Sequence, residues 1–215
     1  MSYTEVPPNL AGISTISLPA EYPQFHHWYP RCELNHKRFW LDNIKPHWTM
    51  LDVGANIGIF SILFSKLCSK VYAFEPVTES VDKLRVNLKH NNCADNVEVI
   101  PLAVSNWTGV RQEKIHSIWE HEVQDKEFEF TTLDDWIKAR NNLHVDALKI
   151  DVDSYDYEVL LGAEQFLRAQ RPIVVAELNH ALALRGFTKE QPQAFMKELG
   201  YTMIQLDDDN YAFIP

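Results

Sequence analysis

The chain is short of glycine, cysteine and positive charge, and it has no long apolar run. Its 215 residues include seven glycines and three cysteines, Cys32, Cys68 and Cys93, and the cysteine spacing is not that of a metal site. We therefore expect reduced thiols, as in a cytoplasmic protein. The apolar runs are too short to span a membrane, and the first ten residues lack the basic and then apolar pattern of a signal peptide. The sequence predicts a soluble cytoplasmic protein without a membrane partner.

The charge balance limits the class of partner. Twenty basic and thirty acidic side chains leave a formal net charge of −10. This charge opposes attraction to phosphate backbones, so we expect no nucleic-acid partner. A hydrophobic content of 46% at this length predicts one globular domain over residues 1–215.

Two of the seven glycines lie within five residues, in the segment LDVGANIGIF at positions 51–60. Apolar residues at positions 50, 51 and 53 predict a buried strand, and those from Ile57 onward predict one face of a helix. Gly54 to Gly58 then form the turn between them. Glycine allows a left-handed backbone and close approach of a ligand, while the helix N-terminus offers free N–H groups. The segment predicts a nucleotide-type ligand site, although a plain tight turn is also compatible with it.

An acidic residue ends the next predicted strand, VYAFE. Glu75 follows Gly54 by 21 positions, which suits a carboxylate that accepts hydrogen bonds from ribose hydroxyls. A dinucleotide fingerprint GxGxxG would need glycine where the chain has Asn56 and Ile59. A GxGxG pattern departs only at Asn56, and asparagine tolerates left-handed φ. The pattern favours S-adenosylmethionine over NAD, and a nicotinamide oxidoreductase remains a weaker alternative.

The order of predicted elements gives the fold class. Residues 1–32 carry five prolines and many aromatic side chains, and we expect an irregular arm there. Helices and strands alternate afterwards, which predicts an α/β fold with a parallel sheet and a C-terminal antiparallel hairpin. The predicted strands are 49–53, 71–75, 97–100, 146–151, 172–177, 202–206 and 211–214, and the predicted helices are 33–44, 57–68, 78–91, 155–168 and 188–199.

An acidic, polar insert at residues 107–130 interrupts this alternation. Its end, EFEF, alternates as an exposed strand does, and Thr132 is placed to cap the following helix. We expect the insert to form a wall of the substrate site or a solvated surface loop.

Seven segments in this order resemble FkbM-type S-adenosylmethionine-dependent methyltransferases. They are LDVGANIGIFS, VYAFEPVTESVDKLRVNLKHN, VEVIPLAVSNWTG, TLDDWI, LKIDVDSYDYEVLLGAEQFL, RPIVVAELN and FMKELGYTMI. The resemblance implies a Rossmann-like class I methyltransferase fold with a seven-stranded, mostly parallel sheet. It also implies methyl transfer, usually to a hydroxyl of a sugar or secondary metabolite. The chain departs from the family pattern at Ser154, where the turn after the fourth strand usually has glycine.

Site roles follow from this resemblance and from the chemistry of the residues. We expect the methionine end of the cofactor to lie against the turn and the ribose against Glu75. Ser105 and Asn106 are expected at the adenine edge. Asp52 is expected either to orient the turn or the methionine ammonium group, or to have a structural role. The turn residues are Gly54, Ala55, Asn56 and Gly58.

The acceptor hydroxyl must lose its proton during an in-line displacement. The ends of parallel strands border the crevice of the glycine turn. His180 is the preferred general base because an imidazole titrates near neutral pH. Asp151 and Asp153 are expected to position the hydroxyl, and Glu177, Trp28 and Glu33 to contact the substrate. Asp151, Asp153, Glu177 and Asn179 also suit magnesium.

Other readings stay open at this level. The carboxylates of Asp151, Asp153 and Glu177 also suit an amine acceptor, hence an N-methyltransferase. A non-catalytic S-adenosylmethionine-binding partner protein is a third alternative. The aromatic arm, with His26 and His27, is able to close over its own site or to cross to a second subunit, which makes a homodimer an additional expectation.

Overall fold

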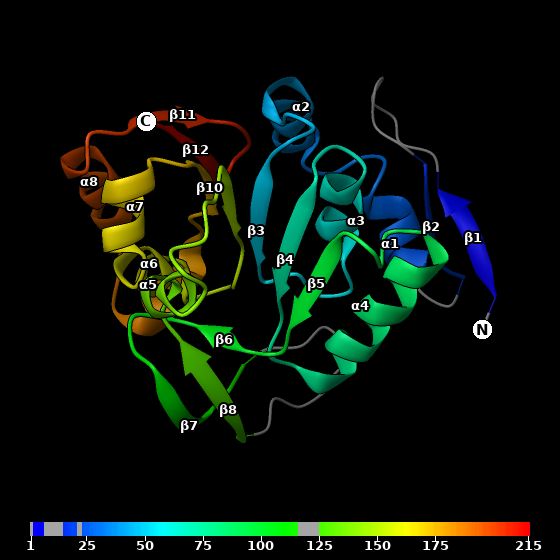
Figure 1. The fold of residues 1–215 in the computed structure, drawn as a ribbon, viewed down its shortest axis with the longest axis horizontal. Helices are drawn as coiled ribbons and strands as arrows, with labels where there is room; N and C mark the ends of the chain where they lie inside the picture. Colours follow the sequence, from blue (N-terminus) through cyan, green and yellow to red (C-terminus); the bar gives the residue numbers. More distant parts are fainter. Residues whose placement is uncertain (1, 7–14, 21–22, 116–124) are drawn as a thin grey trace.

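A seven-stranded sheet forms the centre of the computed structural model, which describes residues 2–6, 15–20, 23–115 and 125–215 (Figure 1). The strand order is β11-β12-β10-β9-β3-β4-β5. The strands are β3 (Thr49–Val53), β4 (Lys70–Phe74), β5 (Val97–Ile100), β9 (Ala147–Ile150), β10 (Ile173–Glu177), β11 (Thr202–Gln205) and β12 (Asn210–Ile214).

Five neighbouring strands of this sheet are parallel. Val53 of β3, for example, pairs with Phe74 of β4 on one side and with Ile150 of β9 on the other. β12 runs antiparallel to both of its neighbours, β10 and β11. The predicted α/β fold with a mostly parallel sheet and an antiparallel C-terminal hairpin is therefore confirmed. The hairpin places its second strand inside the sheet, and β11 forms the edge.

Helices cover both faces of the sheet (Figure 1). One layer contains α2 (Leu34–Asn43), α3 (Ile59–Ser65) and α4 (Thr78–His90), and the other contains α5 (Leu133–Lys138), α6 (Asp156–Leu161), α7 (Glu164–Gln170) and α8 (Glu190–Glu198). Successive residues of β3 enter different cores, with Met50 in one and Leu51 in the other. A strand buried on both faces carries apolar residues on both, which explains why Met50, Leu51 and Val53 are apolar while Asp52 is the one buried charge in β3.

The N-terminal segment is more regular than expected. β1 (Tyr3–Val6) and β2 (Ile16–Pro19) form an antiparallel pair, and α1 (Pro23–Trp28) follows. The side chain of Asn91, just after α4, accepts from the N–H of Ser17 at 2.7 Å and donates to its carbonyl at 2.8 Å. The prediction of an irregular arm was wrong here. Pro19 ends β2 and Pro23 begins α1, and a missing N–H costs little at such positions.

The predicted acidic insert contains part of a second, three-stranded sheet with the order β6-β8-β7. Its strands are β6 (Ala103–Val104), β7 (Gly109–Glu113) and β8 (Lys126–Thr131). Phe128 and Phe130 of EFEF are buried while Glu127 and Glu129 are exposed, so the predicted alternation is confirmed. The middle of the insert, residues 116–124, lies outside the described residues.

Local details differ from the sequence prediction at a few helix ends. The single helix expected over 155–168 is divided into α6 and α7 around Gly162, where a Cβ would lie 2.1 Å from the carbonyl oxygen of Ser105. Because Gly162 has no side chain, its backbone packs directly against the backbone of Ser105. Thr132 caps α5 as predicted, since it accepts a hydrogen bond from the N–H of Asp135 at 2.9 Å. A short 3-10 helix, η1 (His180–Arg185), was not predicted.

None of the helices in the described ranges is both long and apolar enough to cross a membrane.

Candidate active site

The turn between β3 and α3 has the left-handed backbone that its sequence predicts. The φ angles are 82° at Gly54, 51° at Asn56 and 91° at Gly58. A Cβ on Gly54 would lie 1.8 Å from the carbonyl oxygen of Asp151, so this position accepts only glycine without a shift of the backbone. The end of β9 therefore packs directly against the turn.

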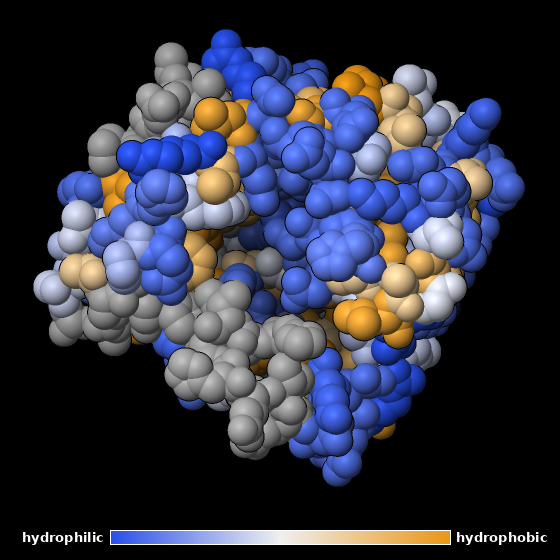
Figure 2. Space-filling model, turned by 180° about the vertical axis from the view of Figure 1, so that it is seen from behind, coloured by the Kyte–Doolittle hydropathy of each residue, from blue (hydrophilic) through white to orange (hydrophobic). Residues whose placement is uncertain are grey.

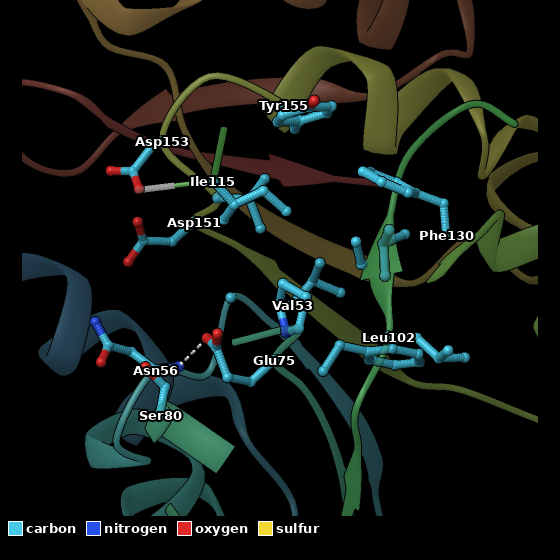
Figure 3. A pocket seen from close by; sticks show the side chains of 16 residues that line it. Val53, Asn56, Glu75, Ser80, Leu102, Ile115, Phe130, Asp151, Asp153 and Tyr155 are labelled. Carbon is cyan, nitrogen blue, oxygen red and sulfur yellow. Dashed lines mark hydrogen bonds between the residues drawn. The ribbon is translucent and has the colours of Figure 1, made fainter. Parts of the chain in front are cut away.

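Glu75 fixes the other side of the turn. Its carboxylate accepts a hydrogen bond from the N–H of Asn56 at 2.8 Å (Figure 3) and another from the N–H of Val77 at 2.9 Å. Burial raises the pKa of Glu75 to about 7, with the two N–H groups acting against this shift and Asp52 and Asp153 adding to it. The site therefore favours a ligand whose hydroxyl groups donate to this carboxylate.

A first cavity of about 300 Å³ opens beside Glu75. Figure 3 shows Asp151 and Asp153 toward one side of this cavity and Leu102 and Phe130 toward the other. The apolar wall comes from five different parts of the chain, and it includes Val53, Leu102, Ile115, Phe130 and Tyr155. Ile115 and Phe130 belong to the insert that was expected to form a wall of the substrate site, whereas sequence reasoning did not single out Leu102 or Tyr155. The alternation of EFEF was a usable signal for Phe130, since it marks a side chain that points inward.

Ser105 and Asn106 lie just beyond this wall. Ser105 is fully buried, and its N–H donates to the carbonyl of Thr131 at 3.1 Å. Its hydroxyl donates to Asn106 Oδ1 at 3.3 Å. The residues along the cavity are Leu102 to Val104, directly before Ser105 in the chain. The expected adenine contact of Ser105 and Asn106 stays a prediction, and the cavity points to the preceding residues.

Asp52 belongs to a buried charge cluster behind the turn. The hydroxyl of Ser61 donates to Asp52 Oδ2 at 2.5 Å, and Lys149 Nζ lies 3.3 Å from Asp52 Oδ1 and 3.3 Å from Asp151 Oδ2. Burial alone lowers the pKa of Lys149, but the carboxylates of Asp151, Asp52 and Glu33 outweigh it and raise the pKa. Lys149 is thus a charged group under the turn. These contacts favour a structural role for Asp52.

A second cavity of about 500 Å³ lies on the other side of the turn. It shares Gly54, Asn56 and Asp151 with the first cavity. Its further lining includes Phe25, His27, Trp28, Ala55, Phe60 and Lys149. The structure therefore brings the predicted substrate residue Trp28 next to the glycine turn. On the side opposite to the view of Figure 1, the surface is hollowed and bordered largely by hydrophilic residues (Figure 2).

The turn after β9 has Ser154 where the family pattern has glycine. Asp153 carries the left-handed φ of 61°, whereas Ser154 has no positive φ. The N–H of Ser154 donates to the carbonyl of Val152 at 2.8 Å. Aspartate tolerates the left-handed region better than most residues. The Ser154 substitution is therefore accommodated, and Asp153 lines the first cavity.

The predicted site residues at the end of β10 and just after it do not line the two cavities at the turn. Glu177 and Glu33 border a third cavity of about 640 Å³, together with the acidic segment 207–209. Burial raises the pKa of Glu177 to about 9, and Asp151, Asp156 and Glu33 add to this shift. His180 is exposed at the start of η1 and is not among the residues that line the three cavities. Its role as general base stays a prediction.

The amide of Asn179 is already engaged. It donates to Glu177 Oε2 at 2.8 Å and accepts from the N–H of Ala181 at 2.7 Å. Among the residues that the structure describes, no three His, Cys, Asp or Glu side chains converge as a metal site would require. The suggested magnesium site at Asp151, Asp153, Glu177 and Asn179 therefore finds no support in the described part of the chain.

The fold and a family match together place this chain among the methyltransferases. A sequence model described as the methyltransferase FkbM domain matches residues 52–203, and the chain belongs to this family. The resemblance noted in the sequence is confirmed. A search of curated proteins gave no match.

Solved structures share the fold at low sequence identity. The methyltransferase FkbM from Methylobacillus flagellatus KT has a TM-score of 0.55 and 14% identity, covering 92% of this chain and 56% of that chain. A Streptococcus mutans protein described as a methyltransferase, in complex with SAH, has a TM-score of 0.53 and 13% identity, covering 83% and 93%. An rRNA methylase from Streptococcus thermophilus has a TM-score of 0.50 and 13% identity, covering 84% and 92%. The chain thus spans little more than half of the first of these proteins.

Proposed function

We propose that this protein transfers the methyl group of S-adenosylmethionine to a hydroxyl oxygen of a sugar or small secondary metabolite. The observation that carries the proposal is the meeting of two cavities at one glycine turn, where both contact Gly54, Asn56 and Asp151. A group transfer needs a donor and an acceptor held on either side of one point. The bound cofactor supplies an electrophilic methyl group at that point.

The first cavity fits the nucleoside part of the cofactor. Glu75 offers carboxylate oxygens to ribose hydroxyls, and Leu102 and Phe130 offer an apolar wall to a flat ring. Asn56 Oδ1 is buried and has no hydrogen-bond partner within the described residues. A buried acceptor of this kind is expected to receive a donor, and the ammonium group of the methionine part supplies one. These residues therefore fit the cofactor without any metal ion.

The second cavity suits the acceptor. Aromatic side chains of Phe25, Trp28 and Phe60 pack against the carbon face of a sugar or against a flat metabolite. Asp151 stands between the two cavities and accepts the hydrogen bond of the acceptor hydroxyl, with Lys149 holding its carboxylate in place. His27 lines this cavity, so two histidines, His27 and His180, are candidates for the base.

Calorimetric titration of the purified protein tests the proposal directly. We expect binding of S-adenosylmethionine and S-adenosylhomocysteine and no binding of NAD, with no change when magnesium is added. Acceptors carrying hydroxyl groups are then screened for transfer of a labelled methyl group. Binding of NAD alone would overturn the proposal, and cofactor binding without transfer to any acceptor would favour the non-catalytic alternative.

An amine acceptor is a second candidate, which the charge around the site favours. Asp151 and Asp153 line the first cavity, and Glu33 and Glu177 line the third. This concentration of carboxylates attracts cations and repels phosphate groups. The same charge supports a small-molecule rather than a nucleic-acid substrate, although one protein of similar fold is an rRNA methylase. Competition between matched alcohols and amines in the transfer assay separates hydroxyl from amine methylation. A cytoplasmic location and a homodimer also remain proposals.

A further inference from the structure

Lys37 places a charged group inside the wall of the second cavity. Its side chain comes from α2 and is fully buried. Lys37 Nζ lies 4.1 Å from the centre of the Trp28 ring, 5.5 Å from that of Tyr29 and 5.8 Å from that of Phe60. It also donates a hydrogen bond to the carbonyl of Cys32. Trp28, Cys32 and Phe60 all line the second cavity, so Lys37 touches three of its wall residues from behind.

These contacts join two parts of the chain. Trp28 and Cys32 belong to the N-terminal segment, whereas Phe60 belongs to α3, next to the glycine turn. An ammonium group over an aromatic face is attracted by the ring, and the attraction grows when water is excluded. Lys37 therefore connects the N-terminal wall of the cavity to the turn that carries the cofactor site.

A buried lysine costs free energy, because its ammonium group is removed from water. Burial lowers the pKa of Lys37 to about 8, while Glu33, Cys32 and Asp207 act in the opposite direction. A methionine would fill a similar volume without the cost of removing a charge from water. Since an apolar residue would serve as filling, the retained charge points to a role of the charge itself.

We propose that Lys37 is a positioning residue whose ammonium group fixes Trp28 and the Cys32 carbonyl, and thereby sets the N-terminal wall of the second cavity. That this wall contacts the methyl acceptor rests on the function proposed above. The charged or titratable groups around Lys37 include Glu33 and Cys32 just before α2, Asp207 in the loop between β11 and β12, and Tyr29, whose ring centre lies 5.5 Å from Lys37 Nζ. Lys149 approaches the same Phe60 ring, at 5.1 Å from its centre.

The test follows Trp28 in the ¹⁵N-labelled full-length protein by NMR. The indole N–H signal of Trp28 is assigned with Trp28→Phe and recorded from about pH 6.5 to about pH 9.5, which brackets the shifted lysine. In the wild-type protein we expect the signal to move with a single midpoint near pH 8, where Lys37 loses its charge. In Lys37→Met we expect a displaced signal that no longer moves around this pH.

Lys45→Met is the matched control, because Lys45 Nζ lies 5.9 Å from the centre of the Trp48 ring at an exposed position. It is expected to leave the Trp28 signal and its midpoint unchanged. If Lys37→Met does not fold, Lys37→Arg decides, since arginine keeps its charge throughout this range and should abolish the midpoint. A Trp28 signal that titrates in either Lys37 variant as in the wild type would overturn the proposal.

The experiments distinguish a failure of the proposed role of Lys37 from a failure of the proposed methyltransferase function. Lys37 is not part of the first cavity, so Lys37→Met is expected to keep its affinity for S-adenosylhomocysteine within about twofold, a difference well below that of one hydrogen bond. Absence of that binding in the wild-type protein would overturn the proposed methyltransferase function, whereas the Trp28 titration would still test the role of Lys37. Once an acceptor is known, its KM is expected to rise in Lys37→Met with little change in kcat.

Discussion

The carboxylate of Glu75 accepts a hydrogen bond from the backbone N–H of Asn56 at 2.8 Å, which ties the end of β4 to the glycine turn after β3. The same carboxylate faces the first cavity. One side chain therefore shapes the turn and presents acceptors to a ligand. This double role makes Glu75 the most informative position for testing the cofactor site.

Replacing Glu75 by glutamine is expected to weaken the binding of S-adenosylhomocysteine by roughly 10-fold to 100-fold, the usual worth of a hydrogen bond to a charged group. Calorimetric titration measures the change. Glu79→Gln, at an exposed position in the first turn of α4, is the control and should bind like the wild type. Equal affinities of Glu75→Gln and the control would remove Glu75 from the cofactor site.

Binding of S-adenosylhomocysteine is expected to strengthen as the pH rises through about 7, because the pKa of Glu75 lies there and only the carboxylate form accepts from both ribose hydroxyls. Titrations between about pH 5.5 and about pH 8.5 bracket this value.

Folding raises this pKa above its ordinary value of 4.5, so the contribution of Glu75 to the free energy of unfolding is lost as the pH rises through 7. Glu75→Gln should flatten both pH profiles, and unchanged profiles would contradict the assignment.

Gly54→Ala is expected to abolish cofactor binding and to lower the free energy of unfolding by more than about 3 kcal/mol, since clash and strain add. The new Cβ would meet the Asp151 carbonyl oxygen at 1.8 Å in a residue with φ of 82°. Gly186→Ala is a close control, because Gly186 has φ of 78° but nothing within 4 Å of the added Cβ. The free energy of unfolding of Gly186→Ala should fall only by the cost of placing a Cβ on a left-handed backbone, about 1 to 2 kcal/mol. Similar losses in both variants, measured by urea unfolding, would exclude a specific clash at the turn.

Lys149→Met is expected to lower the free energy of unfolding by about 3 to 5 kcal/mol, because it leaves the carboxylate of Asp52 buried without its cation. The double variant Asp52→Asn with Lys149→Met should lose much less than the two single losses combined, since no charge then remains buried. Lys70→Met removes a partly exposed pair with Glu98 and should cost at most about 1 kcal/mol. Additive effects at Asp52 and Lys149 would show that the two groups are not coupled.

The candidate site was partly visible in the sequence. The glycine turn, Glu75 and the ends of the parallel strands were found because local backbone demands and the order of elements mark them. Trp28 was found only as one aromatic residue among many. Lys149 and Lys37 were missed as contributors, since the sequence around a lysine does not reveal which carboxylate or ring it will meet.

The sequence by itself determined the α/β architecture and the glycine turn, because periodicity and left-handed backbone positions are properties of neighbouring residues. The family followed from the resemblance of seven segments. Tertiary structure decided what surrounds the turn. The apolar wall of Leu102 and Phe130, the Asp52–Lys149 pair and the contact of Lys37 with Trp28 join segments from different parts of the chain. Such contacts depend on how layers pack and which groups lose water, and neither is encoded in local spacing.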